Sequence, residues 1–151
     1  MVKIADSLYQ TIVASMPIVC VDLIIRNSIG HVLLLKRCNA PAKDQWWFPG
    51  GRVLMNEYRS DAARRKAQQE CGLVLTKALN LRGTYELFFN EGGKNYHSVT
   101  TLFETALDND CPVILDAQSK EFIWVNPLST QENDLHKFIT SNLIRIEINY
   151  E

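Results

Sequence analysis

The most constraining feature of the chain is the helix that the sequence predicts from about Ser60 to Cys71. Ala63, Ala67 and Cys71 recur at spacings of four and form a narrow stripe of small side chains, and Gly72 is a helix stop. Because small side chains let a helix pack closely on a sheet, the rest of the chain must supply a sheet with an apolar face.

The remaining segments predict that sheet and two further helices. Apolar residues recur every four positions from about 4 to 16, which favours an N-terminal amphipathic helix closed by Pro17. Ser129 and Glu132 form a capping-box pattern that predicts the start of a last helix. Six runs have the bulky or β-branched residues of strands: 18–26, 31–37, 46–53, 79–89, 96–107 and 122–125. We therefore expect an α/β (α+β) fold in which α-helices cover both sides of a mixed β-sheet.

Length and composition place these elements in a single domain over residues 1–151. The chain is 46% hydrophobic and 22% charged, which suffices for a core that folds alone.

The formal net charge of −1 leaves no basic surplus for nucleic-acid or membrane binding. Pro17 and Asp22 interrupt the longest apolar stretch, so no membrane span is expected. The 4 cysteines lack metal-ligand spacing and no signal peptide precedes them, which favours a cytoplasmic protein with reduced thiols.

The spacing of polar residues in the stretch 51–73 gives the strongest indication of function. Its fixed positions are Gly51, Glu57, Arg65, Glu70 and Gly72. With this spacing the stretch resembles the Nudix box, which reads Gly, five residues, Glu, seven residues, Arg-Glu, apolar, any, Glu-Glu, any, Gly, apolar. The preceding Trp-Phe-Pro-Gly-Gly run, 47–51, is also similar to the usual entry into that box. The resemblance implies the Nudix fold and a hydrolase.

Two positions depart from the box, and both remove negative charge. Lys66 and Gln69 stand where the family has glutamates, and on a helix they share a face with Glu70. In the usual enzymes that face carries three carboxylates, which hold several Mg²⁺ ions against a diphosphate. Here the face sums to zero charge. We therefore expect at most one metal ion, and we disfavour two-metal activation of water for attack on phosphorus.

Outside the box the chain resembles the GDP-mannose mannosyl hydrolases, a Nudix subfamily with a similar loss of carboxylates. The matching segments lie between Pro17 and Glu70: 21–25, 27–30, 34–39, 41–42 and 47–53. The resemblance implies cleavage of the bond between the sugar's anomeric carbon and the diphosphate, which gives GDP and free sugar. It also implies one Mg²⁺ ion and a homodimer with an extra N-terminal helix. An oxygen-only ligand set would accept Mn²⁺ as well.

The resemblance assigns roles to particular residues. Asp22 would lie near the anomeric carbon as positive charge develops, and a carboxylate in a β-branched strand is costly unless it faces solvent or a site. Arg37 and Arg52 would bind the leaving diphosphate, since guanidinium forks match phosphate oxygens. The Mg²⁺ ligands would be the carbonyl of Gly50, the carboxylate of Glu70 and the amide oxygen of Gln118. We further hypothesise that Lys66 binds substrate as a fixed positive charge.

Two subfamily positions are missing. Ser119 follows Gln118 where the subfamily has its general base, a His, and Ser98 follows His97 where it has a Tyr. A neutral Ser cannot take a proton from water near pH 7 without a partner. His97 and Glu121 are the replacement candidates, because each is close in sequence to a missing group.

Other interpretations remain open on the sequence. The chain could be a Nudix pyrophosphohydrolase that splits a phosphoanhydride. It could also be a nucleotide-sugar-binding module without turnover, which the departures at Lys66, Gln69, Ser98 and Ser119 permit. Glu57 and Arg65 could form an ion pair that only fixes a loop to the helix. Lys66 and Glu70 could be a solvated i,i+4 pair.

Overall fold

A mixed β-sheet organises the part of the chain that the computed structural model describes, residues 3–132 and 134–148. Within those residues it has seven strands: β1 (Ile18–Arg26), β2 (Val32–Arg37), β3 (Trp46–Trp47), β4 (Gly50–Arg52), β5 (Asn80–Glu91), β6 (Lys94–Ala106) and β7 (Ser119–Val125). β1 runs parallel to β6 along its whole length, and its other neighbours, β2 and β4, are antiparallel to it. β1 therefore lies inside the sheet, where its residues 21–25 are buried on both faces.

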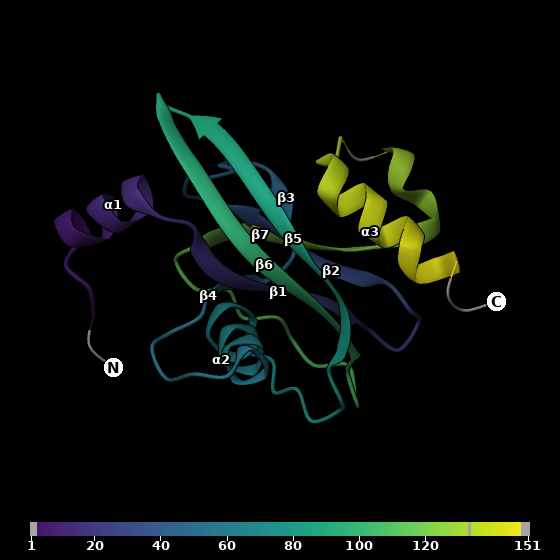
Figure 1. The fold of residues 1–151 in the computed structure, drawn as a ribbon. Helices are drawn as coiled ribbons and strands as arrows, with labels where there is room; N and C mark the ends of the chain where they lie inside the picture. Colours follow the sequence, from purple (N-terminus) through teal and green to yellow (C-terminus); the bar gives the residue numbers. More distant parts are fainter. Residues whose placement is uncertain (1–2, 133, 149–151) are drawn as a thin grey trace.

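Helices cover both faces of this sheet (Figure 1). They are α1 (Asp6–Ser15), α2 (Arg59–Cys71) and α3 (Lys137–Ile148), with a 3-10 segment η1 (Pro127–Glu132) before α3. α2 packs on one face and α3 on the other, whereas α1 lies beside the start of β6, where Lys94 Nζ donates to Gln10 Oε1 over 3.3 Å. The expected arrangement of a mixed sheet between helices is confirmed.

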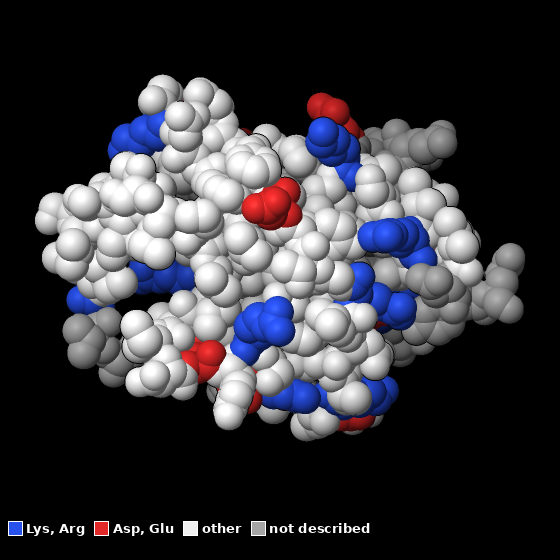
Figure 2. Space-filling model, viewed as in Figure 1, with Lys and Arg blue, Asp and Glu red and all other residues white. Residues whose placement is uncertain are grey.

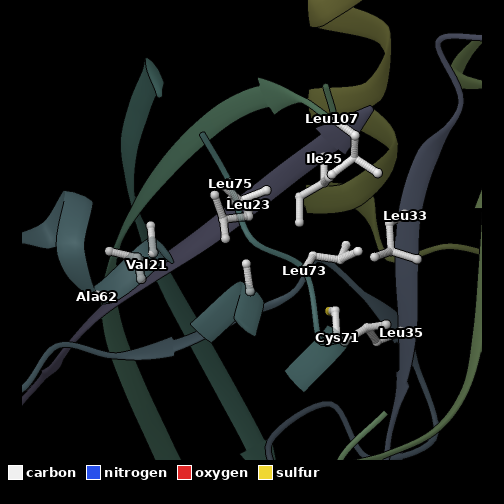
Figure 3. Packing of buried hydrophobic residues seen from close by; sticks show 12 residues of the cluster. Val21, Leu23, Ile25, Leu33, Leu35, Ala62, Cys71, Leu73, Leu75 and Leu107 are labelled. Atoms are coloured by element: carbon white, nitrogen blue, oxygen red, sulfur yellow. The ribbon is translucent and has the colours of Figure 1, made fainter. Parts of the chain in front are cut away.

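The small-residue stripe of α2 explains its close packing. Ala62, Ala63 and Ala67 are fully buried in a cluster with Leu23 and other odd-numbered residues of β1 (Figure 3). Successive residues of a strand point to opposite faces. Ile24 accordingly belongs to the second core, under α3. One strand thus supplies apolar residues to both layers.

The last helix begins later than the capping-box pattern predicts. Ser129 lies in η1 with a non-helical φ of −115°, and α3 starts at Lys137. The backbone N–H of Phe138 donates to His136 Nδ1 over 3.1 Å, so a histidine caps the start of α3. The prediction of a helix opening at Ser129 was wrong because the chain first forms a short 3-10 turn there.

We expect Gly72→Ala to destabilise the fold more than Gly92→Ala. Both glycines have a left-handed backbone, with φ of 67° and 59°, which costs another residue about 1 kcal/mol. An added Cβ at Gly72 would also lie 3.2 Å from Ile114 Cβ, whereas one at Gly92 meets nothing within 4 Å. Urea unfolding should show a loss of about 1 kcal/mol for Gly92→Ala and about 2 kcal/mol for Gly72→Ala. Equal losses would show that packing around Gly72 contributes nothing.

Candidate active site

A cavity of about 490 Å³ opens where α1, α2 and β4 meet the sheet. Six of the seven residues that the sequence nominates line it: Asp22, Arg37, Gly50, Arg52, Lys66 and Gln118. The seventh, Glu70, does not line the cavity but contacts two residues that do. The face of the molecule in Figure 2 shows lysines and arginines interrupted by uncharged and acidic side chains. The cavity itself is lined by the basic side chains of Arg37, Arg52, Arg65 and Lys66.

Asp22 is a buried carboxyl group held by strand pairing. β4 pairs with β1 so that Gly50 lies opposite Asp22, and an added Cβ at Gly50 would come within 2.2 Å of Asp22 Oδ1. The indole N–H of Trp47 donates to Asp22 Oδ2 over 3.0 Å. Burial raises the pKa of Asp22 to about 8, although the Trp47 hydrogen bond and the charge of Arg37 act in the opposite direction. At neutral pH this side chain is mainly a protonated acid.

Glu70 and Lys66 form a buried ion pair that joins α2 to β4. Lys66 Nζ lies 2.7 Å from Glu70 Oε1, and each side chain is 8% exposed. The backbone N–H of Gly50 donates to the other oxygen, Glu70 Oε2, over 3.1 Å. Both carboxylate oxygens of Glu70 therefore have partners. The interpretation of this pair as a solvated one is wrong, because both groups are removed from water.

The two arginines nominated for diphosphate binding are held in different ways. Arg37 donates from Nε to the carbonyl of Pro41 over 2.8 Å. The guanidinium carbon of Arg52 lies 4.3 Å from the centre of the Tyr9 ring, a cation–π contact. Arg52 Nη1 is buried and has no hydrogen-bond partner among the described residues. A buried N–H donor without an acceptor is costly. The position of Arg52 Nη1 therefore indicates a place where an anion can bind.

Arg65 and Glu57 tie the loop before α2 to the helix. Arg65 Nε lies 2.6 Å from Glu57 Oε1, and Arg65 Nη2 donates to Glu57 Oε2 over 2.9 Å. Arg65 Nη2 also donates to the backbone carbonyl of Arg52 over 3.1 Å. The geometry agrees with a structural role for this pair, and it fixes the backbone of Arg52 at the cavity.

Of the two candidates for a replacement general base, one lies at the cavity. His97 lines it, its ring stacks on Phe88 with centres 4.3 Å apart, and its Nε2 is 3.3 Å from Glu86 Oε1 without hydrogen-bond geometry. Glu121 is not among the lining residues and pairs with Lys36 at 3.8 Å. Closeness in sequence therefore identified His97 as a cavity residue but failed for Glu121.

Several cavity residues escaped the sequence reasoning. Tyr9 comes from α1, and no spacing in the sequence connects it with Arg52. Trp47 is buried in the core, and nothing in the sequence indicates its hydrogen bond to Asp22. Cys20 also lines the cavity, and burial raises the pKa of its thiol to about 12, so it is no nucleophile at neutral pH.

The residues present do not fit a divalent metal ion at the expected position. Within residues 3–132 and 134–148, no group of three or more His, Cys, Asp or Glu side chains is arranged to hold a metal. Mg²⁺ demands free oxygen ligands in near-octahedral geometry. Of the three expected ligands, Glu70 is the one carboxylate, and both of its oxygens are engaged, by the Lys66 ammonium group and by the Gly50 N–H. Gln118 donates to Asp116 Oδ2 through its amide nitrogen over 3.3 Å, so this hydrogen bond leaves its amide oxygen unused.

Comparisons with known proteins agree with this fold. The model of the NUDIX domain family matches residues 16–143, and the chain belongs to this family. Enzymes of the family generally use divalent metal ions and bind small-molecule nucleotide substrates. Among the described residues, no helix has the length and apolar character needed to cross a membrane.

Two sequence relatives and two solved structures illustrate the range of the family. The low-salt glycan biosynthesis protein Agl8 of Haloferax volcanii is 43% identical, over 72% of this chain and 70% of its own length. An ADP-ribose pyrophosphatase of Methanocaldococcus jannaschii is 30% identical, over 82% of this chain and 71% of its own length. The crystal structure of a MutT protein from Methanosarcina mazei has a TM-score of 0.77 at 22% identity, over 91% and 98% of the two chains. The NUDIX domain of Shewanella oneidensis NrtR, complexed with ADP ribose, has a TM-score of 0.70 at 17% identity, over 96% and 99%. The structures establish the similarity of fold.

We expect Asp22→Asn to flatten the pH dependence of stability between about pH 4 and 8. The pKa of Asp22 is about 8 in the folded chain against an ordinary 3.8, so folding takes up a proton in this window. The unfolding free energy contributed by this group therefore falls by up to about 1.4 kcal/mol for each pH unit of increase. Asparagine does not titrate but still accepts from Trp47. Urea unfolding across the window measures the difference, and parallel curves for both proteins would contradict a protonated Asp22.

Proposed function

We propose that this chain hydrolyses a nucleoside diphosphate sugar, GDP-mannose or a similar compound, at the bond between the anomeric carbon and the diphosphate. The products would be the nucleoside diphosphate and the free sugar. The observation that supports this most is the unpartnered, buried Nη1 of Arg52 in a cavity that it shares with Arg37. Cations placed in advance lower the barrier for departure of an anion.

The proposed reaction uses the arginines to receive the leaving group. Arg37 is anchored through Nε, which leaves the two other nitrogens of its guanidinium to donate to phosphate oxygens. Arg52 is held by Tyr9 and, through its backbone, by Arg65. Two guanidinium groups fixed in this way need little rearrangement as negative charge develops on the diphosphate.

Asp22 would act first as an acid and then as an anion. In its protonated form it does not repel the diphosphate, and it can give its proton to the oxygen that leaves the anomeric carbon. The carboxylate that remains would stabilise the positive charge on that carbon. A water molecule would complete the hydrolysis by attacking the same carbon, and His97 is the cavity residue that could accept its proton.

The relatives bear on the substrate in two ways. The Haloferax relative is named for glycan biosynthesis, and glycans are built from activated sugars, which supports a sugar-carrying substrate. The Methanocaldococcus relative is named an ADP-ribose pyrophosphatase, which favours phosphoanhydride cleavage as the second candidate function. The first function agrees better with the cavity, because Asp22 is the only acidic side chain among the described residues that line it. The guanine base, the mannose sugar and the homodimer stay predictions.

Hydrolysis in ¹⁸O-water distinguishes the two reactions. A panel of nucleoside diphosphate sugars would be incubated with the chain, with and without Mg²⁺, and the products separated. We expect free sugar that carries the label, together with unlabelled nucleoside diphosphate. A nucleoside monophosphate and a sugar phosphate, with the label in one of their phosphate groups, would establish phosphoanhydride cleavage instead. Thermal stabilisation by a nucleotide sugar without any product after hours would indicate a binding module.

Arg52→Lys should lower kcat/KM for the nucleotide sugar that the chain hydrolyses by roughly 10- to 100-fold, because one hydrogen bond to a charged group is lost. Lysine keeps the charge but cannot offer the planar fork. Arg145→Lys is the matched control, because Arg145 lies on α3, outside the lining of the cavity. The assignment of Arg52 would be wrong if both variants kept the parent kcat/KM.

A further inference from the structure

We infer that the ammonium group of Lys66 takes the place of a divalent metal ion in this cavity, so that the chain binds a nucleoside diphosphate group without metal. The inference rests on the proposed function only in taking a diphosphate as the ligand. It is carried by the buried contact of Lys66 with Glu70, by the engagement of Glu70 on both oxygens and by the position of Lys66 on the cavity wall.

Lys66 is held in one place by its surroundings. One turn of α2 brings its ammonium group to Glu70, and the stem of the side chain packs against β4. A Cβ added at Gly51 would lie only 2.7 Å from Lys66 Cε. Gly51, which has no Cβ, thus makes room for the lysine stem. The charge is fixed at the point where α2 and β4 meet.

A divalent ion at Glu70 would have to displace this ammonium group. Such an ion binds a carboxylate oxygen at about 2.1 Å, so on Oε1, the oxygen that Lys66 contacts at 2.7 Å, it would lie within about 5 Å of Lys66 Nζ. Both groups are positive, and Glu70 is only 6% exposed, so water screens their repulsion weakly. The stem of Lys66 lies close to Gly51, and Asp22 is the one other acidic residue among the described residues that line the cavity or contact its wall at Glu70.

Lys66 has donors to spare for a ligand. An ammonium group carries three N–H donors, and the contact with Glu70 uses one of them. Lysine binds phosphate as a point charge, whereas arginine binds it as a fork. A diphosphate between Arg37, Arg52 and Lys66 would therefore meet three protein cations from β2, β4 and α2. These cations supply the charge that a metal ion supplies in other enzymes of the family.

Binding of nucleoside diphosphates with and without metal tests this inference. Isothermal titration calorimetry with GDP, ADP and UDP would be performed in excess EDTA and again in excess Mg²⁺. We expect at least one of the three to bind in EDTA with a Kd within about threefold of that in Mg²⁺. Loss of all binding in EDTA, or no binding of any of them in either buffer, would overturn the inference.

Lys66→Met separates the charge of the lysine from its length. The variant should bind the diphosphate roughly 10- to 100-fold more weakly in EDTA, and Mg²⁺ should restore part of the affinity because Glu70 Oε1 loses its ammonium partner. Lys66→Arg is the matched control that keeps a positive charge, and circular dichroism would establish that both variants fold. Unchanged affinity of Lys66→Met in EDTA would contradict a role for the ammonium group.

Direct titration with Mn²⁺, followed by its electron paramagnetic resonance signal, reports on the metal without any ligand. We expect no Mn²⁺ bound by the parent chain and one ion bound by Lys66→Glu. One tightly bound ion in the parent chain would overturn the inference. These readouts are independent of turnover, so a chain that binds GDP in EDTA but splits no nucleotide sugar would contradict the proposed function alone.

Discussion

The contact between Lys66, Glu70 and the backbone of Gly50 is the interaction on which the site depends. It removes a cation and an anion from water, which is costly unless each finds good partners. Here each carboxylate oxygen has a donor at hydrogen-bond distance, and the lysine stem is packed against Gly51. The contact joins the helix α2 to the short strand β4. It thereby sets the position of the neighbouring residues that face the cavity.

The arrangement of the sheet brings the remaining groups to the same cavity. β1 supplies Val21 and Leu23 to the core beneath α2, while Asp22 between them faces the opposite side of the sheet, near Trp47. β2 ends at Arg37, and β4 ends at Arg52. Residues that are far apart in the sequence therefore converge because antiparallel pairing with β1 brings these strand ends together. The apolar layers hold the strands, and the polar residues at their ends form the site.

Much of this could be predicted from the sequence, and the reasons differ between elements. The stripe of small residues and Gly72 sufficed for α2, because close helix packing and a left-handed stop each leave a local signal. The group Asp22, Arg37 and Arg52 was nominated by family resemblance and lies in one cavity. The contact of Tyr9 with Arg52 could not be predicted, since the placement of α1 depends on tertiary packing. The start of α3 was missed because His136 caps it rather than Ser129.

The buried state of Lys66 was also beyond the sequence. Helical spacing places it on the same face as Glu70, but the spacing is the same for a solvated pair and for a buried one. Only the close approach of β4 decides between them, and this approach requires a glycine at position 51. The protonation of Asp22 has the same origin, because its burial depends on how β4 and Trp47 enclose it. Both chemical properties come from packing between segments.

A crystal structure of the chain with a nucleoside diphosphate, grown in the presence of Mg²⁺, would examine the site most directly. Lys66 should then keep its contact with Glu70 while Arg37, Arg52 and Lys66 all donate to the diphosphate. The contradicting result would be metal density on Glu70, with the Lys66 ammonium group displaced and the arginines away from the phosphates. It would show that the chain binds its ligand through metal ions.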